Sequence, residues 1–109
     1  MNARWDQRIR LDFPVVARFG RFASPCRGME LSGSGILLDR GRSAPFTDHA
    51  FIKLELVLPG LVRPFQTVAR PIWSYGTQHA LKFIGLTPAE QAIIVKHVAR
   101  LLSTASYLN

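Results

Sequence analysis

The spacing of hydrophobic residues changes once in this 109-residue chain, about four fifths of the way along it. Before that point apolar and polar residues tend to alternate, most clearly over residues 51–58, where Lys53 and Glu55 face away from the aliphatic side chains. From Thr87 onward, a capping box with proline at the first helical position leads into apolar residues spaced i, i+4, i+7, i+8 and i+11. The sequence therefore predicts strands first and then one helix over residues 87–105, whose apolar face packs on the sheet.

Six short segments before this helix have the composition of β-strands, at residues 13–19, 27–31, 36–38, 51–58, 65–74 and 79–84. Turn-forming residues separate them, including Gly20, the pair Ser24-Pro25 and the run at 32–35, and residues 40–49 have the composition of an exposed loop. Pro71 interrupts the fifth segment, which indicates a β-bulge or a sheet edge. This order predicts an all-β fold with a terminal helix: a six-stranded antiparallel β-barrel packed by a C-terminal α-helix, forming a single domain over residues 1–109.

Composition indicates whether such a domain is soluble, secreted or inserted in a membrane. Hydrophobic residues make up 48% of the chain, but no apolar run approaches the ~20 residues that a membrane-spanning helix needs. The first residues lack the apolar core of a secretory signal, and Cys26 is the one cysteine, so an internal disulfide is excluded. We therefore expect a soluble cytoplasmic domain without membrane insertion.

The charge is strongly positive, at a formal +7. Eleven of the fourteen basic residues are arginine, and eight of these lie in the first 42 residues beside only four acidic residues. Arginine offers a planar fork of donors that fits phosphate and the O6/N7 edge of guanine. The pattern predicts an N-terminal region that attracts anions, although a solubilising surface in an arginine-rich composition explains the same counts.

Residues that would support catalysis or metal binding are sparse. The sequence contains no phosphate-binding GxxxxGK[ST] loop, no HExxH pair and no GxSxG elbow. His79 is predicted to be a strand residue and His97 a residue on the helix surface, while Cys26 is interpreted as a structural thiol. We therefore predict no enzyme activity, no metal site and no bound cofactor.

Two short motifs remain. Arg4 and Arg8 form an RxxxR pair, which an arginine-rich chain of this length contains about once by chance. After 21 intervening residues, Glu30 begins the motif Glu-x-Ser-x-x-Gly, which includes Ser32 and Gly35 and by itself is typical of a polar β-turn. Neither motif is specific alone.

Together, in this order and spacing, the motifs resemble those of the PilZ domain family, RxxxR followed by [D/N]xSxxG. The resemblance extends over nearly the whole chain. Pro14-Val15 is similar to the opening of the family's first strand. Residues 68–73 are similar to a later strand that ends in an aromatic residue, and residues 79–83 are similar to the strand that pairs with it. Residues 86–90 are similar to the entry of the family's C-terminal helix. The resemblance implies a six-stranded barrel that binds the bacterial second messenger cyclic di-GMP in signalling, motility and biofilm formation.

The resemblance also implies roles for individual residues. Arg4 and Arg8, on an arm of residues 1–11 that is expected to be mobile without ligand, would contact phosphate or the guanine O6/N7 edge. Glu30 would accept hydrogen bonds from the guanine Watson–Crick edge, Ser32 would bond to the ligand, and Gly35 would let the backbone approach it. Trp73 is a candidate stacking surface, with core packing as the alternative. Arg10 and Arg70 would contribute general positive potential.

One departure from the family pattern is Glu30, which is a methylene longer than the usual Asp or Asn. Three hypotheses follow: a module that binds cyclic di-GMP, a degenerate PilZ adaptor in pilus assembly or motility that binds no nucleotide, and a small basic barrel that binds RNA or single-stranded DNA. Only Phe19 and Phe22, among Arg18 and Arg21, support the third. Since the sequence shows no effector domain, we expect the signal to pass by contact with an unidentified effector protein.

Overall fold

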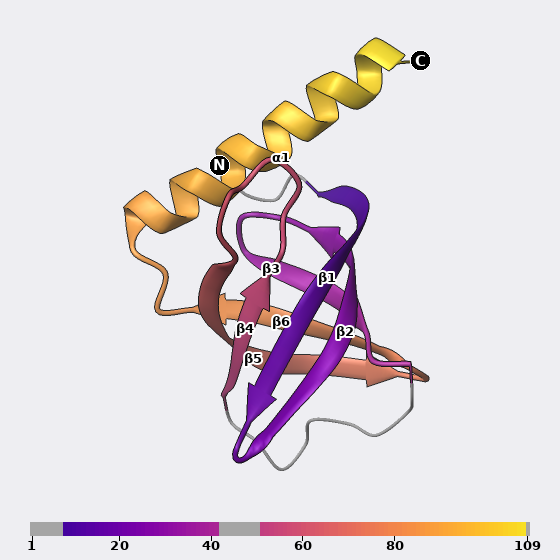
Figure 1. Cartoon of the computed structure of the whole chain (residues 1–109), viewed down its shortest axis with the longest axis vertical. Helices are drawn as coiled ribbons and strands as arrows, with labels where there is room; N and C mark the ends of the chain where they lie inside the picture. Colours follow the sequence, from indigo (N-terminus) through magenta and orange to yellow (C-terminus); the bar gives the residue numbers. More distant parts are fainter. Residues whose placement is uncertain (1–7, 42–50, 109) are drawn as a thin grey trace.

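The computed structural model describes residues 8–41 and 51–108, with side chains up to Ser103. Across these residues six antiparallel strands close into a barrel and one helix follows, which confirms the predicted fold class (Figure 1). The elements are β1 (Ile9–Phe19), β2 (Phe22–Leu31), β3 (Gly35–Asp39), β4 (Ile52–Leu56), β5 (Phe65–Tyr75), β6 (Gln78–Ile84) and α1 (Pro88–Leu108).

The strands are arranged in the order β1-β2-β3-β6-β5-β4, and β4 pairs back with β1 to close the barrel. The closing pairs run from Val15 with Leu56 to Arg18 with Lys53. Each described strand therefore has a neighbour on both sides, and no open edge remains among them for another chain to extend.

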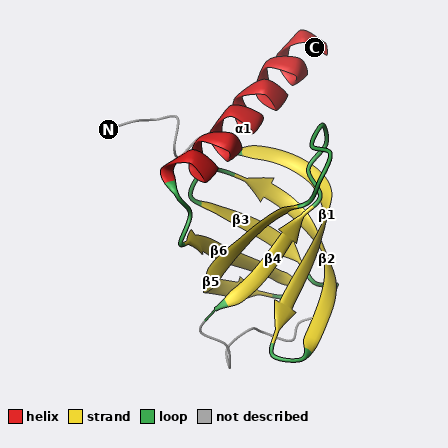
Figure 2. Cartoon of the chain, turned by 60° about the vertical axis from the view of Figure 1, so that its left-hand side comes forward, coloured by secondary structure: helices red, strands yellow, loops and turns green. Residues whose placement is uncertain are grey.

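Inward-facing residues from all six strands fill the barrel, as the period-two pattern predicted. Helix α1 crosses one end of the barrel, so it covers the core from an end rather than from a sheet face (Figure 2). Ile94 and Val98 are its buried contacts with the core, and Leu101 and Leu102 are partly buried against it. Among the described residues, no helix has the length and apolar character required to traverse a bilayer.

Three element boundaries differ from the prediction by three residues or more. Strand β1 begins at Ile9, which is buried, so the last three residues of the predicted arm belong to the barrel, while the arm's earlier part and Arg4 lie outside the described residues. Strand β2 includes Ser24 and Pro25, because Gly20 makes the turn with φ at 59° and antiparallel pairing with β1 continues directly from it. Helix α1 extends three residues beyond the predicted end.

Gly28 is the point where β2 makes room for the largest buried side chain of β1. Its cross-strand partner is Phe13, whose ring is 1% exposed and covers the Gly28 backbone. A methyl group at position 28 would overlap that ring. The residue without a side chain is therefore required by core packing.

We expect Gly28→Ala to lower the free energy of unfolding by about 1–3 kcal/mol, because the Phe13 ring must move out of a close-packed site. Urea denaturation measures the loss. In a Phe13→Leu background the same glycine substitution should cost less, since the smaller side chain leaves space for the methyl group. An equal cost in both backgrounds would show that the ring is not the cause.

His97 is buried, which corrects the prediction that it lies on the helix surface. The residue is 3% exposed and lies beneath the segment between β4 and β5, where Gly60 is close to the imidazole. Neither ring nitrogen has a hydrogen-bond partner within the described part of the chain. Burial, with a smaller contribution from Arg100, lowers the pKa of His97. Burial in the folded protein therefore favours the neutral form of this histidine.

Stability should fall as the pH drops below the ordinary histidine pKa of about 6.5, because the unfolded chain then binds a proton at His97 that the folded chain does not. Urea midpoints at pH 7.5 and 5.5 measure this loss. His97→Leu should reduce the difference between the two pH values but not abolish it, since burial also lowers the pKa of His79. If the stability of His97→Leu falls between pH 7.5 and 5.5 as much as that of the parent, His97 does not contribute to the loss.

Candidate functional site

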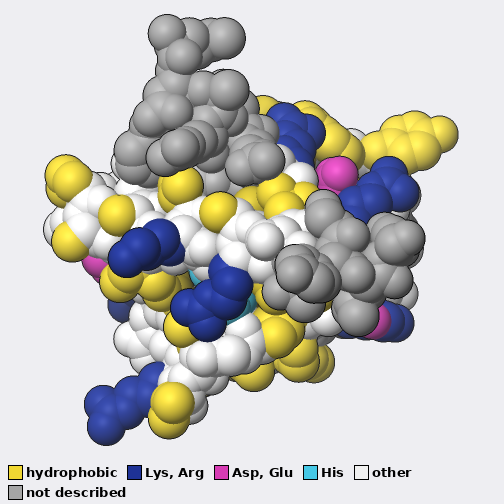
Figure 3. All heavy atoms as spheres, turned by 90° about the horizontal axis from the view of Figure 1, so that it is seen from above, with side chains coloured by type: hydrophobic (Ala, Val, Ile, Leu, Met, Phe, Trp, Pro, Cys, Tyr) yellow, Lys and Arg dark blue, Asp and Glu magenta, His cyan; other side chains and the backbone are white. Residues whose placement is uncertain are grey.

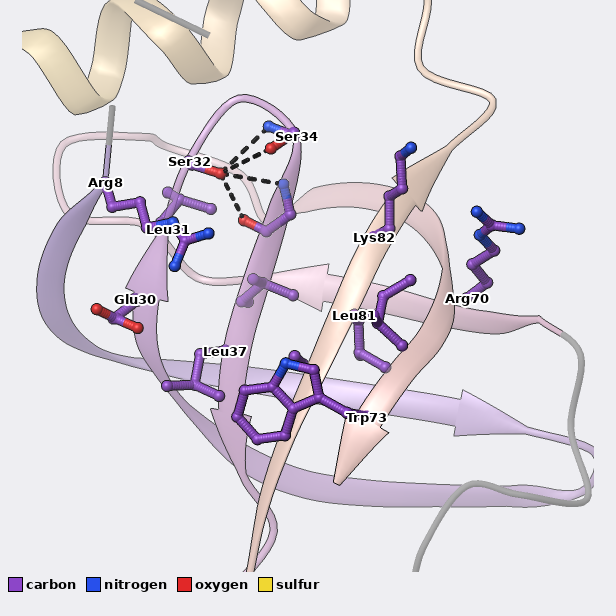
Figure 4. Close-up of a pocket in the computed structure, with 14 residues that line it drawn as sticks. Arg8, Glu30, Leu31, Ser32, Ser34, Leu37, Arg70, Trp73, Leu81 and Lys82 are labelled. Carbon is purple, nitrogen blue, oxygen red and sulfur yellow. Dashed lines mark hydrogen bonds between the residues drawn. The ribbon is translucent and has the colours of Figure 1, made fainter. Parts of the chain in front are cut away.

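A hollow of about 530 Å³ lies on the outer face of the barrel, across strands β2, β3, β6 and β5 (Figure 4). Its volume is within the range typical of small-ligand sites. Arg8, Arg70 and Lys82 bring three cationic groups to the lining, and Glu30 brings one carboxylate. The other lining residues are Leu31, Ser32, Ser34, Gly35, Ile36, Leu37, Ile72, Trp73, Ala80 and Leu81.

A bulge in β2 determines that Glu30 faces this hollow. In a regular strand Glu30 would share the face of Gly28, which points into the barrel. A register shift between these two residues leaves Met29 without a partner in β3, and Glu30 pairs with Leu37 on the outer face. The bulge therefore brings the carboxylate out of the core.

A second bulge, at the opposite side of the hollow, does the same for Trp73. The register of β5 against β6 shifts between Pro71 and Trp73, which confirms the irregularity predicted from the proline. Trp73 then pairs with Ala80 on the outer face and is 51% exposed. Core packing, the alternative role considered for this tryptophan, is therefore excluded.

The outer side chains form two cross-strand rows. In the first row Ala80 is the small residue between Leu37 and Trp73, and the indole extends from β5 across β6 toward Leu37 (Figure 4). The second row contains Gly35, Lys82 and Arg70, each paired with the next. Because the residues at positions 35 and 80 are small, the hollow has an open floor between its charged and aromatic walls.

Gly35 has a structural role of its own. A Cβ atom at this position would lie 2.5 Å from the carbonyl oxygen of Leu81, so β3 and β6 could not pair as closely with any larger residue. The sequence predicted a close approach here, but between the backbone and a ligand. The close approach that the structure contains is between two strands.

Ser32 organises the turn between β2 and β3. Its hydroxyl oxygen accepts hydrogen bonds from the backbone N–H groups of Ser34, at 3.3 Å, and Gly35, at 3.2 Å, and lies 3.2 Å from the Ser34 hydroxyl. The side chain is 5% exposed. Most of its hydrogen-bonding capacity is therefore used within the turn, and a bond to a ligand stays a prediction. The carbonyl of Gly33 in the same turn accepts a bond from Gln91 Nε2 of α1, at 3.4 Å.

Glu30 interacts with a cation outside the hollow. Its Oε1 lies 3.7 Å from Nε of Arg10, its cross-strand neighbour in β1, whose side chain is 90% exposed. The sequence analysis considered general positive potential as the role of Arg10. Arg27 is engaged elsewhere: it hydrogen-bonds to Asp12 and lowers the pKa of that carboxyl group. An exposed pair such as Arg10–Glu30 contributes little stability, so the carboxylate can exchange Arg10 for another donor.

The structure brings together five of the six residues selected from the sequence: Arg8, Glu30, Ser32, Gly35 and Trp73 all line the hollow. The sixth, Arg4, lies outside the described residues. Sequence reasoning gave Arg70 only a general role and missed Lys82. The signal for Lys82 was its place between buried Leu81 and Phe83, which puts it on the outer face beside Gly35.

In the part of the chain that the structure describes, no group of three or more His, Cys, Asp or Glu residues could hold a metal ion. Cys26 is buried, in agreement with its interpretation as a structural thiol. The lining of the hollow instead suits an organic anion, because its charged groups are cationic side chains around one carboxylate.

The fold is that of a closed, helix-capped antiparallel barrel, the architecture expected from the PilZ resemblance. Solved structures that share it include two that match most of this chain. The Bacillus subtilis inhibitor of motility MotI/DgrA matches with a TM-score of 0.75 and 14% identity over 89% of this chain, which spans about half (49%) of that protein. The Legionella uncharacterized protein Lpg0364 matches with a TM-score of 0.59 and 13% identity, over 92% of this chain and 98% of the other. No family model and no curated protein sequence matches.

Ser32→Ala should lower the free energy of unfolding by about 1–3 kcal/mol, because two partly buried backbone N–H groups of the turn lose their acceptor. Hydrogen exchange at Ser34 and Gly35 should accelerate in the same variant. Ser34→Ala is the matched control, and its loss should be smaller since it leaves both acceptor bonds of Ser32 in place. Unchanged stability and exchange in Ser32→Ala would contradict this role.

Proposed function

We propose that this protein binds cyclic di-GMP in the hollow on the outer face of the barrel and relays the signal by contact with another protein. The observation that carries the proposal is the convergence of Arg8, Glu30 and Trp73 on one hollow, from the residue before β1, from β2 and from β5. These residue types supply a cationic fork, an acceptor and an aromatic surface. A ligand with two guanines and two phosphates requires all three.

Guanine recognition is assigned to Glu30 and Arg8. The guanine Watson–Crick edge presents N1–H and N2–H donors, which a carboxylate accepts together, while an arginine fork matches O6 and N7 or a phosphate. The Glu30 side chain is 25% exposed at the wall of the hollow, so hydrogen bonds made there would be partly shielded from water. The departure from Asp or Asn lengthens this side chain by one methylene, so the carboxylate would reach further from the strand.

The size of the hollow favours a ligand with two bases. Glu30 and Trp73 are separated by three strand spacings, or about 14 Å along the sheet. A single guanine at the carboxylate would leave the indole without a stacking partner, whereas a second base of the same ligand can lie against it.

The surface charge supports an anionic ligand. Seen from the helix-bearing end, Lys and Arg side chains are spread over the face of the molecule, and Asp and Glu side chains are sparse (Figure 3). The formal net charge of +7 adds a long-range attraction for a ligand with two phosphates.

A degenerate adaptor that binds no nucleotide is the second candidate. The shared fold with an inhibitor of motility, MotI/DgrA, supports a role in motility for this alternative. The third hypothesis, RNA or single-stranded DNA binding, finds weaker support, because Phe19 and Phe22 lie at the β1–β2 turn, away from the hollow. Calorimetry with cyclic di-GMP, GMP and an oligonucleotide separates the three.

Glu30→Ala should weaken cyclic di-GMP binding by about 1–3 kcal/mol, because guanine donors lose their acceptor, and Glu30→Asp should bind as tightly as the parent or more tightly. Arg8→Ala should weaken binding roughly ten- to a hundredfold. Calorimetric titrations at one salt concentration measure these effects.

Arg10→Ala is the matched control for Glu30→Ala, since it removes the cation beside Glu30 and leaves the Glu30 carboxylate in place. If Glu30→Ala binds more tightly than the parent, the carboxylate competes with the ligand and the assigned role is wrong. If neither the parent nor either Glu30 variant binds, the protein belongs to the adaptor class.

A further inference from the structure

Arg70 and Lys82 are direct cross-strand partners in β5 and β6. Residues opposite each other in an antiparallel pair have Cβ atoms about 5 Å apart, and like charges at such positions destabilise the sheet. Both side chains line the hollow, and within the described residues neither forms an ion pair with a carboxylate. The sheet therefore holds two like charges together without compensation from this part of the protein.

The neighbouring residue in the same row is Gly35, so the surface beside Lys82 is open on the β3 side. Figure 4 shows the Lys82 and Arg70 side chains extending to the same side of the hollow, away from Glu30 and Trp73. An anion above Gly35 would meet an ammonium group and a guanidinium fork. It would also offset the repulsion between them.

We infer that Arg70 and Lys82 form a phosphate-binding subsite, separate from the Arg8–Glu30 end of the hollow. This inference rests on the proposed function, which it extends by giving the ligand a direction: a base at Glu30 and a phosphate at the Arg70–Lys82 pair. A phosphate suits the pair, because its non-bridging oxygens can accept from the fork and from the ammonium group at once.

Reversal of one charge tests the pair. Lys82→Glu turns a like-charge pair into an opposite-charge pair, so the melting temperature of the free protein should rise by roughly 1–5 °C. Affinity for cyclic di-GMP should fall about ten- to a hundredfold, since a phosphate contact is replaced by repulsion. Arg21→Glu is the control: it changes the net charge equally at the β1–β2 turn, outside the hollow, and should change affinity less than about threefold through the general field alone.

A second probe separates this inference from the proposed function. Inorganic pyrophosphate, which has no base, should shift the backbone amide resonances of Gly35, Arg70 and Lys82 in the parent and in Arg21→Glu but not in Lys82→Glu. If cyclic di-GMP fails to bind the parent and pyrophosphate still gives these shifts, the proposed function is wrong and the phosphate subsite stands. If Lys82→Glu binds both probes as the control does, the subsite is wrong while cyclic di-GMP binding stands. If neither probe binds the parent, both are wrong.

Discussion

The candidate site depends on register shifts in the barrel wall. A closed antiparallel barrel assigns each residue to the interior or the exterior by strict alternation, and this rule would place Glu30 beside Gly28, against the core. An unpaired carboxylate there would be costly to bury. The bulge at Met29 removes this conflict by moving one residue out of the pairing pattern, and the bulge after Pro71 exposes Trp73 in the same way. Because both bulges lie on one cross-strand row, two otherwise unrelated segments face a common hollow.

The fold could be predicted from the sequence, because local pattern and chain order are sufficient for a barrel of short antiparallel strands. Alternation at 51–58 marked β4, and the capping box marked the start of α1, where Glu90 and Thr87 exchange the expected bonds. The bulge in β5 was visible because proline disturbs strand pairing. The bulge at Met29 could not be predicted, because no residue at that point disturbs strand pairing as proline does. His97 lies three residues after Ile94, at the flank of the apolar helix face, so helical spacing could have indicated its burial, whereas its cover by the segment between β4 and β5 could not be predicted.

Two of the motif residues have clear structural roles. Ser32 satisfies backbone donors in its turn, and Gly35 allows two strands to pair closely, so their presence would follow from folding even in a barrel that binds nothing. Support for a ligand therefore depends on side chains whose position the fold does not require. Arg8, Arg70 and Lys82 are exposed, and each forms no ion pair within the described residues. Their arrangement around a hollow is explained better by an anion than by stability.

The bond between Gln91 and Gly33 gives helix α1 a mechanical connection to the turn beside the hollow. Ile94 and Val98 anchor the following turns of the helix in the core, so the turn, the core and the helix are joined as one unit. From Gln91 to its end at Leu108 the helix is about 25 Å long. A tilt of roughly 10° at the turn would therefore move its far end by about 4 Å. Small displacements at the hollow would be amplified at a surface well away from it.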